Sequence, residues 1–387
     1  MPATIVPDPC MHVLIDAHLI GAQETGNETY TAGLLGQADV FAAAGWQVFA
    51  LMPAPHPRLI APTQTVADPR CANDLYRFFR AIPRALADLR AGVLHVNYHA
   101  PFWVKTPYVV VIHDISYRAR PHFTSPRNFV LQNGLGWLTA LRASAVVTPS
   151  RFSQGCILRI YPWLRDRIFV TPYAGGRQFY PRPERAIGEV KMRFGIKGDY
   201  FLFVGTPQPR KNVARIVEAF LAATQQRPDC QLVIAGRETP TTRELRQRHR
   251  AAFEAGRIIV TGYHMPVDDL ACLYSGCIAL VFPSLYEGFG IPVLEAMACG
   301  APVITSNTTA LPEAAGDAAL LVNPEDTMAI AQAIRRMLDE PALRAALRAR
   351  GFAHVKQFTW ARTARATAEA YQAAMAWYPK GGHRRRS

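Results

Sequence analysis

Apolar runs of strand length alternate with amphipathic stretches along most of the chain. Apolar runs bounded by glycine, proline or polar residues predict buried strands of a parallel sheet, whereas apolar positions three and four apart predict helices. The alternation of the two favours an α/β fold. The predicted strands lie within 11–17, 46–53, 92–98, 107–117, 144–148 and 168–173, and then within 201–205, 230–236, 257–263, 276–284 and 301–307.

The length of the chain predicts two domains. At 387 residues it is too long for one ordinary core. The segment 181–190 is rich in proline and charge, which is typical of a linker. We therefore predict a first domain over 1–180 and a second over 181–358. From Met328 onwards the pattern is helical, and it includes a last helix at about 360–380.

Charge narrows the class of partner. The chain carries 43 lysines and arginines against 29 aspartates and glutamates, a formal net charge of +14. Such a charge predicts an acidic partner: a nucleoside diphosphate, an anionic membrane surface or a nucleic acid. The basic end, KGGHRRRS, is suited to contact with anionic lipid. A basic nucleic-acid-binding protein is one reading of the charge alone, but no nucleic-acid recognition motif accompanies it.

Cysteine usage and apolar run lengths bear on location. Seven cysteines are scattered without a C-x-x-C pair, which favours a reduced intracellular protein. The first residues lack the charged start and long apolar run of a signal peptide, and no run of about 18 apolar residues occurs. We expect a cytoplasmic protein, with association at the inner face of the cytoplasmic membrane as a further hypothesis.

The stretch 283–300, PSLYEGFGIPVLEAMACG, holds the densest candidate chemistry. It follows an apolar strand, places Glu287 on a loop and Glu295 early in a helix, and contains Gly288 and Gly290 between them. Exposed backbone N–H groups at a helix start bind anions, and two carboxylates at this spacing can hold hydroxyl groups of an extended polar ligand. The alternative is a solvated Glu287 and a Glu295 that interacts only with the helix dipole.

A second loop with candidate chemistry follows the strand that ends at Gly205. The sequence GTPQPRKN brings Arg210, Lys211 and Asn212 directly before a predicted helix. Two cations at the carboxyl end of a parallel strand suit a ligand with several negative charges. Gly236 ends the next strand, where it can line the same edge.

Three segments together resemble a known family. EGFGIPVLE, VGTPQPRKN and LPEAAGDAALLVNPED are similar to those of the retaining nucleotide-sugar glycosyltransferases of family four, also called glycosyl transferases group 1. The resemblance implies the GT-B fold, in which two Rossmann-like domains face each other across a deep cleft. It also implies that 1–180 binds the acceptor, that 181–358 binds the donor, and that the helix at about 360–380 crosses back to the first domain.

The resemblance implies roles for individual residues. His113 would contact the donor sugar, Glu287 the sugar hydroxyls and Glu295 the ribose, while Arg210 and Lys211 would neutralise the leaving diphosphate. A hydrogen-bonded histidine at a strand end is the alternative for His113. Further donor-side candidates are Gly205, Asn212, Gly236, Tyr263, Gly288, Phe289 and Gly290. Acceptor-side candidates are Gly26, Asn27, Asp114 and Ser150, with a structural role as the alternative for Asp114 and a helix cap as the alternative for Ser150.

The chain departs from the family pattern in its first domain. Residues 25–30, TGNETY, stand where relatives carry a glycine-rich loop, and we expect a loop there too. An ordinary helix start with Thr25 or Asn27 as the cap is the alternative. Tyr173 and Ala174 replace the usual Asn-Gly. His95 and His99 are four residues apart on a strand and loop, which favours packing over metal binding.

The implied reaction is transfer of a hexose with retention of anomeric configuration. The chain has no Asp-x-Asp triplet, and Asp268–Asp269 is a bare pair, so we predict no metal cofactor. The donor is taken as GDP-mannose, with UDP- or dTDP-sugars as alternatives, and the acceptor as a glycan or a polyprenyl-diphosphate-linked sugar in polysaccharide or lipopolysaccharide synthesis. A nucleotide-sugar epimerase or a sucrose or trehalose synthase on the same fold is the second reading.

Overall fold

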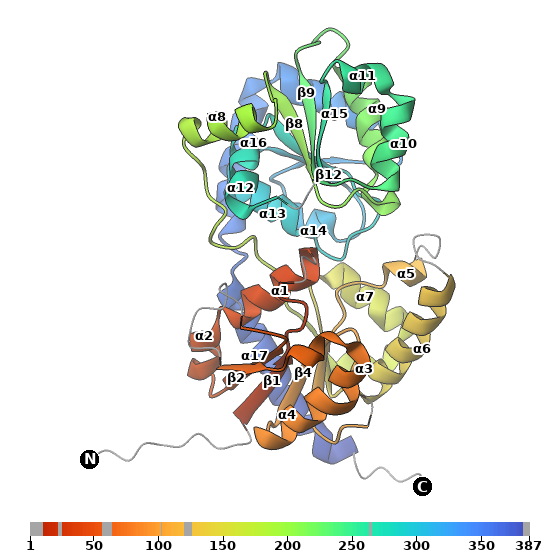
Figure 1. The fold of residues 1–387 in the computed structure, drawn as a ribbon, viewed down its shortest axis with the longest axis vertical. Coiled ribbons are helices and arrows are strands. Elements are labelled where there is room, and N and C mark those ends of the chain that lie inside the picture. Colours follow the sequence, from red (N-terminus) through yellow and green to blue (C-terminus); the bar gives the residue numbers. More distant parts are fainter. Residues whose placement is uncertain are drawn as a thin grey trace, which may run out of the picture. The chain divides into compact units, whose positions relative to one another are not determined.

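The computed structural model describes residues 11–21, 25–55, 64–101, 103–119, 126–262 and 265–381. The chain separates into two compact units (Figure 1). Unit 1 comprises the chain up to Tyr173 and again from Trp360, and unit 2 comprises Ala174–Thr359. The first unit therefore ends a few residues before the predicted boundary, and the last helix belongs to it.

Unit 1 is built on a parallel sheet whose strand order, among the described residues, is β3-β2-β1-β4-β5-β6-β7. The chain runs outwards from β1 to one side and from β4 to the other, so the order reverses between β1 and β4. Ligands bind at such a reversal, outside the carboxyl ends of the strands. The strands are β1 (His12–Asp16), β2 (Gln47–Met52), β3 (Gln64–Ala67), β4 (Val93–Asn97), β5 (Tyr108–Val111), β6 (Ala145–Thr148) and β7 (Ile168–Val170).

The helices of unit 1 cover this sheet (Figure 1). They are α1 (Thr25–Leu35), α2 (Ala38–Ala43), η2 (Pro69–Ala72), α3 (Asp74–Tyr76), η3 (Arg77–Ala81), α4 (Ile82–Asp88), α5 (Ser116–Ala119), α6 (Pro126–Arg142), α7 (Arg151–Ile160), η5 (Pro162–Arg167) and α17 (Trp360–Gly381). The element η3 is a π-helical turn. The prediction of a loop over 25–30 is wrong, because α1 begins at Thr25 and places Gly26 and Asn27 in its first turn.

The last helix, α17, is part of the core of unit 1. Trp360 lies against Gly33 of α1, where a Cβ atom would come within 2.3 Å of the indole ring. The Tyr371 ring packs on Phe41 and Trp46, and its hydroxyl lies 3.0 Å from Nδ1 of the buried His95. This histidine is therefore a packed, hydrogen-bonded core residue.

Unit 2 has a parallel sheet of order β10-β9-β8-β11-β12-β13 in the described residues. Here the reversal falls between β8 and β11. Strand β13 is an element that the apolar pattern did not predict. The strands are β8 (Tyr200–Val204), β9 (Gln231–Arg237), β10 (Ile258–Gly262), β11 (Ala279–Phe282), β12 (Val303–Ser306) and β13 (Leu320–Val322).

Helices cover the sheet of unit 2, and many of their apolar faces join one continuous core. They are α8 (Glu184–Arg193), η6 (Pro209–Lys211), α9 (Val213–Ala223), α10 (Pro240–Arg248), α11 (Arg250–Glu254), α12 (Val267–Gly276), α13 (Ile291–Ala298), α14 (Leu311–Ala315), α15 (Thr327–Asp339) and α16 (Pro341–Val355). Across the described residues, no helix has the length and apolar character needed to span a membrane.

Candidate active site

The carboxyl edge of the unit 2 sheet brings three charged side chains together at its point of reversal. Arg210 and Lys211 follow β8, and Glu287 follows the neighbouring β11. One carboxylate oxygen of Glu287 lies 2.6 Å from Nζ of Lys211, and the other lies 3.2 Å from Arg210. Residues 76 and 77 positions apart in the chain thus form one ion cluster where this fold class binds its ligands.

The cluster keeps Glu287 ionised in a buried place. Burial raises the pKa of a carboxyl group, but attraction to Lys211 and Arg210 and the hydrogen bond from Lys211 outweigh it, so the pKa of Glu287 is lowered. Lys211 also lies 4.7 Å above the centre of the Phe282 ring. Glu287 is 7% exposed, so the carboxylate is held by fixed partners more than by water.

Asn212 ties the loops of this edge together. Its backbone has a φ of 63°, and its side-chain amide donates to the carbonyls of Pro283 and Pro324 at 3.0 and 2.6 Å. The amide oxygen accepts from Arg215. Both amide protons are therefore used within the protein, and this geometry favours a structural role for Asn212 over the predicted donor contact.

The glycines predicted at this edge satisfy backbone requirements. Gly205 has a φ of +125°, and a Cβ atom on Gly236 would lie 2.2 Å from the Gly205 carbonyl oxygen. Gly290 has a φ of +118° and precedes the first turn of α13. These positions need glycine for backbone reasons, whether or not they touch a ligand.

Two other donor-side candidates have different surroundings. Phe289 is buried, and its ring lies 5.9 Å from that of Phe358, so it packs against the segment that follows α16. Gly288 lies in the loop between β11 and α13, next to Glu287. Tyr263 lies outside the described residues.

Glu295 lies on α13 and points into a buried place beside α12. Its carboxyl accepts a hydrogen bond of 3.0 Å from the Tyr274 hydroxyl. Burial raises the pKa of Glu295 to about 8, although the bond from Tyr274 opposes the rise. At neutral pH this group is mostly a neutral carboxylic acid, so it can donate as well as accept a hydrogen bond.

Unit 1 presents a separate polar cluster at its own carboxyl edge. His113, after β5, has Nε2 at 2.9 Å from the Asn97 amide oxygen and Nδ1 at 2.5 Å from the Tyr173 hydroxyl. The Asn97 amide group in turn lies 3.4 Å from the Thr31 hydroxyl on α1. An Nε2–H tautomer satisfies both contacts, with Asn97 as acceptor and Tyr173 as donor.

The surroundings keep His113 neutral. Burial lowers the pKa of His113 to about 3, and the neighbouring His95 adds to the effect. The Tyr98 and Tyr30 rings lie 5.2 and 5.3 Å from the imidazole. Tyr98 has a φ of 59°, which is unusual for a tyrosine and marks local backbone strain.

The acceptor-side candidates of unit 1 have local structural partners. Asp114 accepts from the Ser116 backbone N–H at 2.9 Å, and Ser150 caps α7 by accepting from Ser153 at 3.0 Å. Asn27 uses its carbonyl to accept from Thr31, one turn later in α1. Gly26 has no atom within 4 Å of the position of a Cβ.

Sequence reasoning missed Asn97 and Asp16 at the reversal of the unit 1 sheet. Asp16 ends β1, lies 3.2 Å from Arg77, and lies 2.8 Å from Nδ1 of His18. Asn97 ends β4, the adjacent strand. Polar residues at the ends of two apolar strands were a usable signal for both, but the order of the strands was needed to pair them.

Within the described ranges, no three His, Cys, Asp or Glu side chains are grouped so as to hold a metal ion. Arg210 and Lys211 are cationic side chains at the carboxyl edge of the unit 2 sheet, where they can neutralise an anion.

Comparisons with known proteins cover both halves of the chain. A family model described as Glycosyl transferases group 1 matches residues 190–354, and one described as Glycosyltransferase Family 4 matches residues 33–174. The chain is 34% identical to O-antigen chain mannosyltransferase B of Escherichia coli, over 74% of this chain and 76% of that protein. It is 32% identical to the serotype-specific mannosyltransferase WbdA of Escherichia coli over 59% of this chain, which is 29% of that longer protein.

Solved structures share the fold. Sucrose-phosphate synthase from Thermosynechococcus elongatus superposes with a TM-score of 0.68 at 24% identity, over 93% of this chain and 98% of that one. The two parallel sheets of the chain are those of the GT-B fold, as expected from the sequence.

Proposed function

Because the chain belongs to the family-four, group 1 glycosyltransferases, we propose that it transfers a mannosyl residue from GDP-mannose to a glycan acceptor. The acceptor is a growing bacterial surface polysaccharide carried on a polyprenyl diphosphate lipid. The relative of similar length, an O-antigen chain mannosyltransferase, supports this choice of sugar and acceptor. The enzyme would work in the cytoplasm, at the inner face of the membrane that holds such a lipid.

The observation that carries the proposal is the ion cluster of Arg210, Lys211 and Glu287 in unit 2. Transfer breaks the bond between the anomeric carbon and the diphosphate, and negative charge develops on the diphosphate oxygen that leaves. Fixed cations in a buried place stabilise that charge well. Arg210 and Lys211 are 27% and 12% exposed at their side chains, so water screens them only in part.

A bound diphosphate would change the pairing within the cluster. Its oxygens compete with Glu287 for the two cations, and each N–H that turns to the diphosphate loosens one carboxylate oxygen. Glu287 then has lone pairs to accept from hydroxyl groups of the donor sugar. The same carboxylate can therefore pair with Arg210 and Lys211 or bind sugar hydroxyl groups.

We assign the ribose contact to Glu295. As a neutral acid it can donate to one ribose oxygen and accept from the other hydroxyl. Its bond to Tyr274 fixes the carboxyl in place at 3.0 Å. His113 remains the proposed sugar contact of unit 1, although its two ring nitrogens already have protein partners.

We propose transfer with retention of configuration and without a metal. The acceptor hydroxyl attacks the anomeric carbon from the face that the diphosphate leaves, and its proton passes to the departing diphosphate oxygen. Arg210, Lys211 and the amides of the loop at Gly288 and Gly290 supply the neutralising charge.

Release of nucleotide from purified protein tests this function. We would supply GDP-, UDP- and dTDP-sugars, each with EDTA and a mannose-terminated oligosaccharide, and identify the anomer formed. We expect GDP release from GDP-mannose, lowered about a hundredfold or more by Lys211→Ala and by Glu287→Ala. The product should keep the donor's anomeric configuration.

A matched control separates the cluster from surface charge in general. Arg185 and Glu189 form an exposed ion pair on α8 of the same unit, and Arg185→Ala should leave release unchanged. Release from another donor in place of GDP-mannose would correct the donor. Full activity in Lys211→Ala would remove the role of the cluster.

A further inference from the structure

Unit 1 exposes large apolar side chains on the helical segment from η2 to α4. Leu75 is 70% exposed and Phe79 is 56% exposed, one helical turn further on. On its opposite side the segment buries Arg77, Ala81 and Ile82. The segment therefore exposes apolar side chains on its outer face in addition to those that it buries on its inner face.

Phe79 is held in an outward position. Its ring stacks on Trp103 with the centres 4.4 Å apart and the planes 11° from parallel. Trp103 belongs to the loop between β4 and β5, so the stack joins the helical segment to that loop. An exposed apolar group that is ordered by a neighbour costs less entropy to bury against a partner than a free one.

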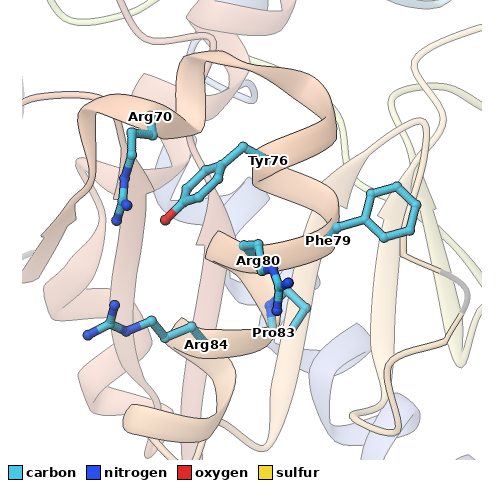
Figure 2. Close-up of a pocket in the computed structure, with 6 residues that line it drawn as sticks. All are labelled: Arg70, Tyr76, Phe79, Arg80, Pro83 and Arg84. Atoms are coloured by element: carbon cyan, nitrogen blue, oxygen red, sulfur yellow. The ribbon is translucent and has the colours of Figure 1, made fainter.

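Arginines lie on the same segment. Arg70, Arg80 and Arg84 line an open groove of about 580 Å³ with Tyr76, Phe79 and Pro83. Figure 2 shows Arg70, Tyr76 and Arg84 on one side of the segment and Phe79 pointing to the other. Leu75, Phe79, Arg80 and Arg84 are all exposed, and Arg80 follows Phe79 directly in the chain. We call these four residues, which occupy adjoining sides of the segment, the arginine–aromatic patch.

The charge of the patch is only weakly compensated. Arg84 has Asp88 at 3.4 Å, but both side chains are more than half exposed, so the pair is weak. The neighbouring Arg70, outside the patch, binds Asp68, and its guanidinium also lies 4.5 Å above the Tyr76 ring. Arg80 makes no ion pair with any described residue. Positive charge next to exposed apolar groups complements an anionic lipid surface, where arginine meets headgroups and apolar side chains enter the acyl region.

The segment that carries the patch begins at the edge of unit 1 that carries the polar cluster. Helix η2 follows the carboxyl end of β3, and Arg77 of η3 reaches Asp16 at the carboxyl end of β1. Asn97, at the end of the adjacent β4, bonds His113. A lipid surface bound at the patch would therefore lie next to the carboxyl edge of the unit 1 sheet, where we expect the acceptor to bind.

We propose that the arginine–aromatic patch docks the enzyme on an anionic phospholipid membrane. Leu75 and Phe79 enter the interfacial region, and Arg80 and Arg84 bind the phosphates of the headgroups. The net charge of +14 draws the protein to such a surface from solution. The inference rests on the proposed function only in giving the docking a purpose, which is access to a lipid-linked acceptor.

Vesicle sedimentation tests the docking without any sugar donor or acceptor. The whole chain would be mixed with vesicles of phosphatidylcholine alone, or of phosphatidylcholine with phosphatidylglycerol, at low and high salt. We expect binding to the anionic vesicles, weakened by salt, and none to the neutral ones. Leu75→Ser with Phe79→Ser should lower the affinity at least tenfold, and Arg80→Gln and Arg84→Gln about fivefold each.

Two matched controls use other exposed residues. Trp137 and Leu141 on α6 are 47% and 44% exposed, and their change to serine removes a similar apolar area from the same unit. Arg185→Gln with Arg250→Gln removes two exposed charges from unit 2. Both control pairs should bind vesicles as the unchanged protein does. Thermal unfolding and GDP release with a soluble acceptor would show that the patch variants are folded and active.

Three results would overturn the proposal. They are failure of the unchanged protein to bind anionic vesicles, unchanged binding by the patch variants, and an equal loss of binding in the α6 pair. Because the vesicle assay contains no substrate, its failure would leave the glycosyltransferase function untouched, and a failure of GDP release would leave the docking untouched.

Discussion

At the level of single side chains, His113 has a hydrogen-bond partner within the protein at each of its ring nitrogens. Tyr173 donates to Nδ1, and Asn97 accepts from Nε2–H. The hydrogen bond to Nδ1 depends on Tyr173, which stands where the family resemblance implies an Asn-Gly pair. We interpret Tyr173 as a positioning residue that fixes the orientation and tautomer of a histidine predicted to face the donor sugar.

Tyr173→Phe tests that interpretation. The variant keeps the ring, which lies 4.8 Å from Tyr30 and 6.0 Å from Trp360, but leaves Nδ1 of His113 buried without a donor. We expect a loss of about 1–2 kcal/mol in the free energy of unfolding. We also expect kcat/KM to fall roughly tenfold, because the imidazole is no longer fixed. Nitrogen NMR should show a mixture of His113 tautomers.

Tyr108→Phe is the control for this change. It removes another buried tyrosine hydroxyl of unit 1, one that donates to the Thr139 carbonyl at 2.9 Å. It should cost similar stability and leave kcat/KM unchanged. If both variants lower kcat/KM alike, the effect of Tyr173 is structural and the positioning role is refuted.

At the level of helices and strands, two glycines of α1 have opposite surroundings. Gly33 lies under Trp360 of α17, with three indole atoms within 2.6 Å of the position of a Cβ. Gly26 has open space around that position. One helix therefore offers a test of how α17 packs and a test of the predicted acceptor contact.

Gly33→Ala should destabilise unit 1 by about 1–3 kcal/mol, because the added methyl displaces the indole. Gly26→Ala should stabilise it by up to about 1 kcal/mol, since alanine is the better helix former. Denaturant unfolding of each variant measures both effects. A Gly33→Ala protein as stable as the unchanged one would mean that Trp360 does not pack on α1. A loss of activity in Gly26→Ala would support the predicted acceptor contact.

The elements and the site differed in how far the sequence could predict them. Apolar runs predicted most strands, because burial on both faces leaves a plain record in composition. The start of α1 at Thr25 was mistaken for a loop, since TGNETY combines glycine and polar residues that suit turns and helix starts alike. The pairing of Glu287 with Lys211 could not be predicted, because it depends on β8 lying next to β11.

At the level of the whole molecule, the two units should respond to pH in opposite directions. Unit 1 buries His95 and His113, and burial lowers the pKa of each to about 3. Their contribution to stability is present above the unfolded pKa of about 6.5 and is lost as the pH falls towards 3. Unit 2 buries Glu295, whose raised pKa of about 8 has the reverse consequence.

For Glu295, the folded state holds its proton more tightly than the unfolded state does. Its contribution to stability is therefore complete below the unfolded pKa of about 4.3 and is lost as the pH rises through about 8. Glu295→Gln removes this titration. Acidification from about pH 8 to about pH 5 should thus stabilise unit 2 through Glu295 and destabilise unit 1 through His95 and His113.

Scanning calorimetry at about pH 5 and about pH 8 can separate the two effects. Gly33→Ala identifies the unfolding transition of unit 1, because it lowers the midpoint temperature of that transition. Glu295→Gln identifies the transition of unit 2 in the same way. Between about pH 8 and about pH 5, we expect unit 2 of the unchanged protein to gain stability relative to unit 2 of Glu295→Gln. The gain should be up to about 1.4 kcal/mol for each pH unit. If the stability of unit 2 differs between the unchanged protein and Glu295→Gln by the same amount at both pH values, Glu295 is ionised in the folded state. Its proposed ribose contact would then be that of a carboxylate, which accepts hydrogen bonds and donates none.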